Sequence, residues 1–177
     1  MPINHLSLVN QKLAYAGSII SVLNIPLSEP NATQRLQQQA LGDAAVFHLA
    51  MALHFYLREH AEQHRIKNLS GIGSVQDLFL ALQQEDKSSS ESSELLELVQ
   101  TTDTWLNQLT RYYDLLFRSP EKPRAKKAFG QENRIELIEL TEIDVQPTLQ
   151  LTPALLASWL DSFRALVMRQ RETSAEY

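Results

Sequence analysis

Histidine is the side chain best suited to metal binding and to proton transfer near neutral pH, and four of this chain's five histidines lie within seventeen residues. His48 and His54 interrupt the apolar run AAVFHLAMALHFYL, whereas His60 and His64 stand in the polar, basic stretch that follows it. We therefore expect two pairs in two environments. The first pair should be buried in a core helix, and the second should lie on an exposed helix end.

The second pair has the spacing of metal ligands. Residues four apart lie on the same side of a helix, so His60 and His64 could bind one metal ion together. A metal site needs further ligands, and the local candidates are His5, Glu59 and Glu62. The chain contains no Glu-x-x-His motif of the kind that binds iron in helical bundles. A solvated helix end is the simpler interpretation, and we expect no cofactor.

Four polar residues lie in or beside the apolar run: Asp43, His48, His54 and Arg58. In helical projection His54 lies near Asp43 and Arg58, which predicts a row of buried polar groups. Buried polar side chains are usually hydrogen-bonded structural elements. The alternative is a histidine whose shifted pKa allows it to act as a general base in a cleft.

Arg58 and His64 also resemble the arginine–spacer–histidine pattern of helical nuclease bundles that are often linked to toxins. In those bundles the pair cleaves RNA at a dimer interface, and the histidine transfers protons. A basic helix end that holds several histidines produces such a match easily. A metal-binding or RNase-like hydrolytic bundle that uses His60 and His64 is therefore kept as an alternative function.

A cluster of positive charge lies in the sequence RSPEKPRAKK, residues 118–127. Its cations could contact the phosphates of a nucleic acid, with an affinity that falls as the salt concentration rises. The segment also contains two prolines and matches no known nucleic-acid-reading element, so a solvated linker is the simpler interpretation. Its basic residues are Arg118, Lys122, Arg124, Lys126 and Lys127.

Composition sets the broad class of the protein. The chain has 177 residues, of which 44% are hydrophobic, and a net charge of −5, which gives no general attraction to nucleic acid or anionic membranes. The absence of cysteine excludes disulfides, thiolate metal sites and a cysteine nucleophile. The N-terminal sequence does not resemble a secretory signal, and the longest apolar run is shorter than the ~20 residues of a membrane span. We expect a cytoplasmic protein that does not associate with a membrane.

Apolar residues at three- and four-residue spacings predict the helices. The first covers residues 6–23 and the second about 31–66, with Gly42 as a point where the helix bends or divides. Because residues 44–57 are apolar on nearly every side, we expect the second helix to be the central one. On one face of this helix, which includes Leu36 and Phe47, residues recur most regularly at three- and four-residue spacings.

The next part of the chain predicts shorter elements. Ser74 opens a short helix, residues 75–84, by a capping box. The Ser-rich segment at about 84–93 has too few apolar side chains to order itself and is predicted to be a mobile loop. One long helix then follows, with core-facing residues from Leu95 to Leu116.

The C-terminal part consists of an irregular arm, residues 128–151, and a last helix. Within the arm, residues 135–145 fit a strand, a helix or an extended segment. Thr152 as N-cap and Pro153 at the first position open the helix. Its core face consists of Leu156, Trp159, Phe163, Leu166 and Gln170.

Four long helices, one short helix and an extended arm make an all-α, antiparallel helical bundle the predicted fold. We expect one domain that spans residues 1–177.

Five short sequences stand out along the chain: NQKL (10–13), FHLAMAL (47–53), WLNQL (105–109), LFRSP (116–120) and WLDSFRALVMRQRE (159–172). Taken together and in this order, they resemble a family of small, uncharacterised bacterial proteins. This family is best known from Gram-negative proteobacteria and is classed as a domain of unknown function. The resemblance implies a cytoplasmic helical protein and supplies no activity, cofactor or catalytic residue.

These observations favour a non-enzymatic helical bundle that acts through a protein partner or by self-association. The alternatives are the metal-binding or hydrolytic bundle and nucleic-acid binding through the basic linker.

Overall fold

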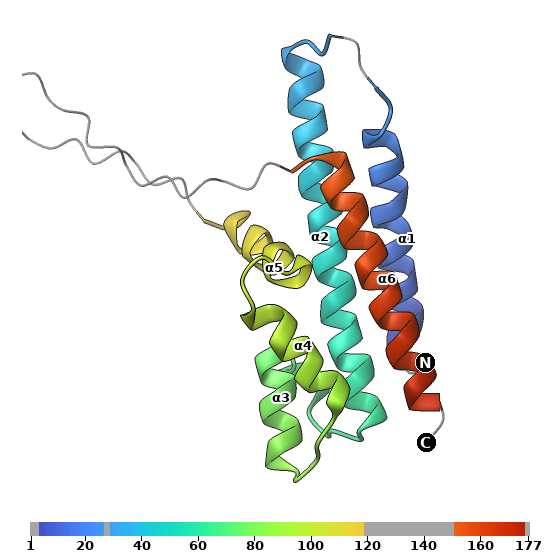
Figure 1. Ribbon diagram of the computed structural model, residues 1–177, viewed down its shortest axis with the longest axis vertical. Helices are drawn as coiled ribbons and strands as arrows, with labels where there is room; N and C mark the ends of the chain where they lie inside the picture. The colour runs from blue at the N-terminus through green and yellow to red at the C-terminus, as the bar shows by residue number, and fades with distance from the viewer. Residues whose placement is uncertain (1–3, 27–28, 119–150, 176–177) are drawn as a thin grey trace, which may run out of the picture.

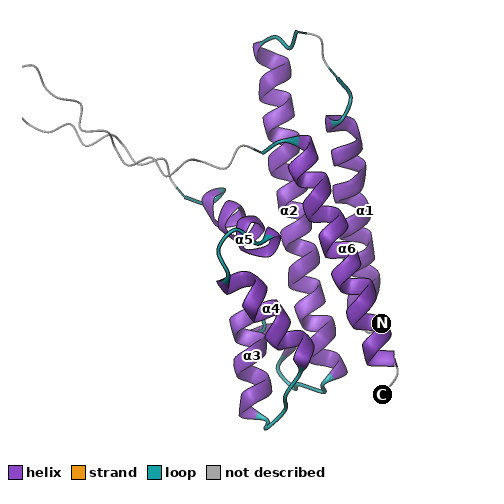
Figure 2. Ribbon diagram, viewed as in Figure 1, coloured by secondary structure: helices purple, strands orange, loops and turns teal. Residues whose placement is uncertain are grey.

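The computed structural model describes residues 4–26, 29–118 and 151–175, and all regular elements in these residues are helical (Figures 1 and 2). This confirms the predicted all-α fold. The elements are α1 (His5–Leu23), α2 (Ala32–Gln63), a 3-10 turn (Leu69–Gly71), α3 (Val75–Gln84), α4 (Ser90–Gln100), α5 (Trp105–Leu115) and α6 (Pro153–Ala175).

Three long helices, α1, α2 and α6, pack along one another, and the three short helices lie on one side of α2 (Figure 1). His5 of α1 lies against Glu62 of α2, which makes the two helices antiparallel. Arg171, near the end of α6, bonds to Glu59 of α2 and to Asn10 of α1. Helix α6 therefore runs antiparallel to α1 and parallel to α2.

Helix α2 is the central helix, and it is continuous through Gly42. Asn31 caps its start by a capping box with Gln34. Leu151 packs 3.7 Å from the point that a Cβ of Gly42 would occupy, so Gly42 admits a neighbouring side chain. By length and composition α2 is also apolar enough to cross a membrane, a test that the core helix of a soluble protein passes too.

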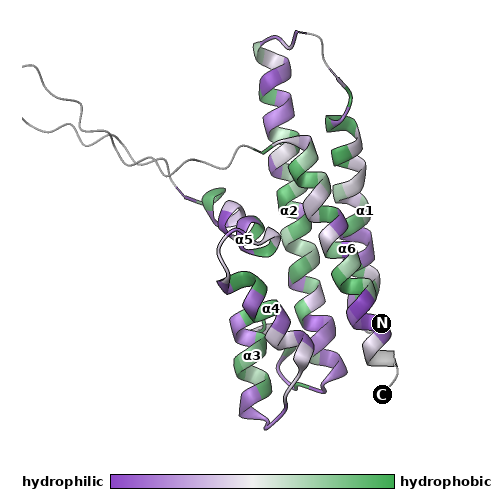
Figure 3. Ribbon diagram, in the orientation of Figure 1, coloured by the Kyte–Doolittle hydropathy of each residue, from purple (hydrophilic) through white to green (hydrophobic). Residues whose placement is uncertain are grey.

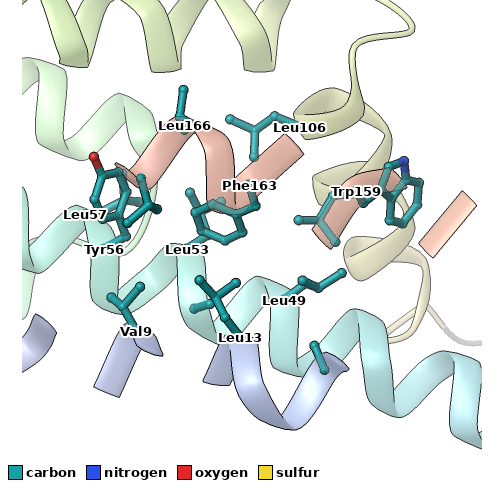
Figure 4. Close-up of a cluster of buried hydrophobic side chains, with 14 of the residues drawn as sticks. Val9, Leu13, Leu49, Leu53, Tyr56, Leu57, Leu106, Trp159, Phe163 and Leu166 are labelled. Carbon is teal, nitrogen blue, oxygen red and sulfur yellow. The ribbon is translucent and has the colours of Figure 1, made fainter. Parts of the chain in front are cut away.

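The core forms where α1, α5 and α6 meet the apolar half of α2 (Figures 3 and 4). The ring of Phe163 is central to it, because its centroid lies 6.2 Å from that of Tyr56 and 5.5 Å from that of Trp105. The predicted core face of α6 is confirmed, since all five of its residues are buried: Leu156, Trp159, Phe163, Leu166 and Gln170.

The face of α2 with the most regular spacing is not the buried face. Leu36 is 68% exposed and Phe47 is 42% exposed, whereas Leu49 and Ala52 are fully buried. Where a helix is apolar on nearly every side, periodicity cannot identify which side the neighbouring helices cover.

The single long helix predicted after the Ser-rich segment is wrong, because the chain forms two short helices instead. Asp103 adopts a left-handed backbone conformation, with φ of 67°. Thr104 then caps α5 by accepting a hydrogen bond from the backbone N–H of Asn107. Its hydroxyl also donates to the carbonyl of Leu98, so the break between α4 and α5 is stabilised locally.

The predicted mobile loop at 84–93 is wrong for its second half, since residues 90–93 are the first turn of α4. The hydroxyl of Ser89 accepts from the N–H of Ser92, and serine is a favoured N-cap residue. Glu91 in the first turn suits the positive end of the helix dipole. The capping box of Ser74 and Asp77 on α3 is confirmed. The irregular arm lies outside the described residues, apart from Leu151.

We expect Phe163→Ala to lower the free energy of unfolding by about 3–5 kcal/mol, because the ring is fully buried and its loss leaves a cavity. Met168→Ala is the matched control on the same helix. Its side chain is 63% exposed, and the change should stay within about 0.5 kcal/mol. Urea unfolding followed by circular dichroism measures both, and equal effects would contradict this description of the core.

Candidate functional site

The four clustered histidines have a pattern of burial opposite to the predicted one. His60, expected on an exposed helix end, is 1% exposed, whereas His48 and His54, expected in the core, are half-buried. His64 is half-buried at the C-cap of α2. The prediction failed because the start of α4 folds back over the end of α2 and covers His60.

His60 takes part in a buried hydrogen-bond chain with α4. Its Nε2 lies 2.9 Å from the hydroxyl oxygen of Ser89. That hydroxyl donates its one proton to the Glu91 carboxylate at 2.8 Å, so it accepts from His60. Burial, and then the charge of His64, lower the pKa of His60 to about 4. His60 is therefore neutral at pH 7, and the Ser89 hydroxyl is fully engaged rather than poised as a nucleophile.

The candidate metal ligands of the same region are occupied by other partners. His5 Nδ1 lies 3.0 Å from Glu62 Oε2. Glu59 accepts two hydrogen bonds of 2.8 Å from Arg171. Among the residues that the structure describes, no group of three or more such side chains could hold a metal ion.

Two polar links that the sequence analysis missed join the helices at this end of the bundle. The guanidinium of Arg171 joins Glu59 of α2 to Asn10 of α1. The Tyr56 hydroxyl donates to Gln170 at 2.6 Å, and Gln170 donates to Glu94 of α4. Gln170 on the apolar face of α6 was the one available signal, because a buried amide requires hydrogen-bond partners.

Arg58 and His64, the two residues that resemble the nuclease pattern, contact different neighbours. Arg58 Nε donates to the backbone carbonyl of Ile72 at 3.3 Å. The ring of His64 lies against that of His60, with centroids 4.8 Å apart. The predicted row of polar groups beside Arg58 is only half-buried. Its Asp43 accepts from the hydroxyl of Tyr112 on α5, at 3.5 Å.

A continuous row of rings crosses α1, α2 and α5, and we call it the aromatic strip: Tyr15, His48, Phe47, Tyr113 and Phe117. Successive ring centroids lie 5.4, 5.7, 6.4 and 5.0 Å apart. Tyr15 is 45% exposed, Phe47 42% and Phe117 67%. Burial and the charge of Lys12 lower the pKa of His48, and its Nδ1 is buried without a hydrogen-bond partner among the described residues. The strip is thus an uncharged surface of closely spaced rings.

A cavity of about 520 Å³, which we call the side cavity, lies between α2 and the three short helices. It forms because α4 packs on α3 and α5 and leaves a space between its C-terminal half and α2. Its walls are mainly apolar, with a polar rim. The lining residues are Ala50, Met51, Leu53, His54, Leu57, Gly73, Ser74, Val75, Gln76, Leu96, Val99, Gln100, Leu109, Thr110, Tyr113 and Asp114.

Among the described residues that line the side cavity, Asp114 is the only aspartate, glutamate, lysine or arginine. Burial, and then the charge of Arg58, lower the pKa of His54, so this histidine is neutral at pH 7. Arg58 itself is not a lining residue. The predicted basic patch contributes only Arg118 to the described residues, where it is exposed. Lys122, Arg124, Lys126 and Lys127 lie outside them.

The chain matches a protein-family model over its whole length. The family is described as "Family of unknown function (DUF6586)", and its model matches residues 1–177. No curated protein and no solved structure matches the chain.

We expect the stability of the protein to fall at mildly acid pH because of His60. The pKa of His60 is about 4 in the folded protein, below its ordinary value of 6.5. The contribution of neutral His60 to the free energy of unfolding is therefore full above about pH 6.5 and is lost as the pH falls through about 4. Between pH 7.5 and 4.5 the wild type should lose about 2–3 kcal/mol more than His60→Gln does. Urea unfolding at both pH values measures this difference. His64→Gln should keep most of the wild-type pH dependence, and identical pH profiles for His60→Gln and the wild type would contradict the assignment.

Arg171→Ala should destabilise the protein by about 2–4 kcal/mol, because it leaves the carboxylate of Glu59, 5% exposed, without its cation. Arg169→Ala is the matched control. Arg169 also pairs with a glutamate, but its side chain is 59% exposed, so the loss should stay within about 1 kcal/mol. Thermal unfolding measures the loss of stability in both variants, and equal losses would rule out a special role for the Arg171–Glu59 pair.

Proposed function

We propose that this chain, which belongs to a family of unknown function (DUF6586), is a non-enzymatic helical module that acts by binding another protein chain. The bound chain is a partner protein or a second copy of the same chain. The observation that carries the proposal is the aromatic strip.

Aromatic side chains contribute much of the binding energy at protein interfaces, since they bury a large area with little loss of conformational freedom. Three rings of the strip are more than two-fifths exposed: Tyr15, Phe47 and Phe117. They come from α1, α2 and the residues just after α5. Tyr15 and Phe47 lie on helices that pack in the bundle core. The backbone that carries these two rings is therefore already ordered before a partner binds.

Charge also favours an interface at this surface. A charged group costs free energy when an interface takes it out of water without a counter-ion. The lowered pKa of His48 keeps the middle of the strip neutral at pH 7. Lys12 lies at one end, with its ammonium 5.5 Å from the centroid of the Tyr15 ring, where cation–π attraction offsets part of its desolvation.

The alternative functions draw less support from the same geometry. His60 is buried and neutral, and the nearby acids are paired with His5 and Arg171. A hydrolytic or metal-dependent reaction would require these contacts to be rearranged. Nucleic-acid binding through the basic linker stays a prediction from the sequence. We further propose a bacterial, cytoplasmic protein, on the basis of the family resemblance and of the absence of cysteine.

The double variant Phe47→Ala/Phe117→Ala tests the proposal. Wild-type protein should capture a partner in a native pull-down with mass spectrometry, or should self-associate in light scattering. The double variant should lose about ten-fold or more of that affinity, the effect of removing central aromatic anchors.

Leu80→Ala/Met168→Ala is the matched control, because it removes two exposed apolar side chains outside the strip. It should bind as the wild type does. A wild-type protein that stays monomeric and captures no partner would end the proposal. Equal losses in the two double variants would also contradict it.

A further inference from the structure

We propose that the side cavity binds a small cationic amphiphile, meaning a molecule with an apolar body and one protonated amine. The proposal goes beyond protein binding at the aromatic strip and rests on a different surface, although Tyr113 belongs to both.

The size and setting of the cavity suit a small molecule. Its volume of about 520 Å³ lies within the range of roughly 300–1,000 Å³ that is common for ligand sites, and helical bundles often place such sites between helices. Its floor consists of buried core residues: Leu53, Leu57, Val75 and Leu109. Because these side chains also hold the bundle together, the floor is already formed before a ligand binds.

The walls suit an apolar body. Met51 and Ala50 of α2 face Leu96 and Val99 of α4 across the cavity, and all four are half-buried. Their apolar surface is in contact with water when the cavity is empty, and an apolar ligand removes it from water at a gain of roughly 25 cal/mol per Å². The unbranched side chain of Met51 can adjust to ligands of different shape.

The polar groups of the rim suit a cation. The carboxylate of Asp114 makes no hydrogen bond or ion pair among the described residues, so it is available to a ligand. His54 is neutral at pH 7, and no lysine or arginine is among the described residues that line the cavity. An ammonium group at the rim would pair with Asp114, and the amide oxygens of Gln76 and Gln100 could accept hydrogen bonds from its remaining N–H groups.

An anionic head group would meet the opposite situation. It would lie near the Asp114 carboxylate, with no cation among the described lining residues to compensate the repulsion. The rim hydroxyl of Thr110 already donates within α5, to the carbonyls of Leu106 and Asn107. The cavity should therefore discriminate between head groups attached to the same apolar tail.

Decylammonium and decanoate provide the test, because they have matched tails and opposite charges. Each is titrated, below its micellar concentration, into the full chain, and binding is followed by the methyl signals of the protein in two-dimensional NMR. We expect saturable binding of decylammonium, about ten-fold tighter than that of decanoate. The shifts should concentrate on Met51, Val75 and Val99 and should spare Val22 in the last turn of α1 and Ile25 just after that helix.

Two variants locate the binding. Asp114→Asn, at an exposed position, should reduce the preference for decylammonium to less than about three-fold while the tail still binds. Ala50→Phe should fill the cavity and weaken both ligands. Ala40→Phe makes the same change on an exposed position of the same helix and should leave binding unchanged.

The proposal is overturned if neither compound binds saturably, if decanoate binds as tightly as decylammonium, or if Asp114→Asn keeps the full preference. Should Ala50→Phe unfold the protein, the Asp114→Asn comparison decides alone. The Phe47→Ala/Phe117→Ala variant should bind decylammonium as the wild type does. The proposal of ligand binding in the side cavity and that of protein binding at the aromatic strip can therefore be contradicted separately.

Discussion

Helix α2 must be covered by protein, because much of its surface from Ala44 onward is apolar and would otherwise face water. The other helices are arranged accordingly. Helix α1 packs along it, α6 covers a second side, and α5 and α3 lie against a third (Figure 1). The polar first turns of α2 need no such cover, and there most side chains are exposed. Cover by several separate helices leaves gaps between them, and both the side cavity and the aromatic strip lie where this cover is incomplete.

At the other end of the bundle, hydrogen bonds join the helices in addition to apolar contacts. Glu59, His60 and Gln170 are buried, and each is paired with a side chain from another segment of the chain. Apolar packing alone tolerates sliding of one helix along another, whereas paired polar groups fix the register. The four clustered histidines accordingly serve two purposes. His60 belongs to this structural network, and His48 contributes an uncharged ring to a surface.

The sequence predicted those features that depend on neighbouring residues. The capping box of Ser74 and the N-cap at Thr152 are local, and so is the apolar stripe of α6, and all three are present. The break before Thr104 was missed, because apolar spacing continues across it and the decisive feature is the left-handed Asp103. The burial of His60 and the side cavity depend on where α4 lies relative to α2. That placement is set by contacts between distant segments, which periodicity along one helix does not contain.

The position of α4 has a mechanical consequence. Its start is held by directional bonds, from His60 to Ser89 and from Gln170 to Glu94. Its other end stops at Gln100, just before the left-handed Asp103, and forms the roof of the side cavity. The carbonyls of Leu98 and Val99 in this half of α4 accept hydrogen bonds from Thr104 and Asn107 at the start of α5. No hydrogen bond among the described residues joins the same half to α2, so a small tilt of α4 about Ser89, followed by the start of α5, would change the width of the cavity.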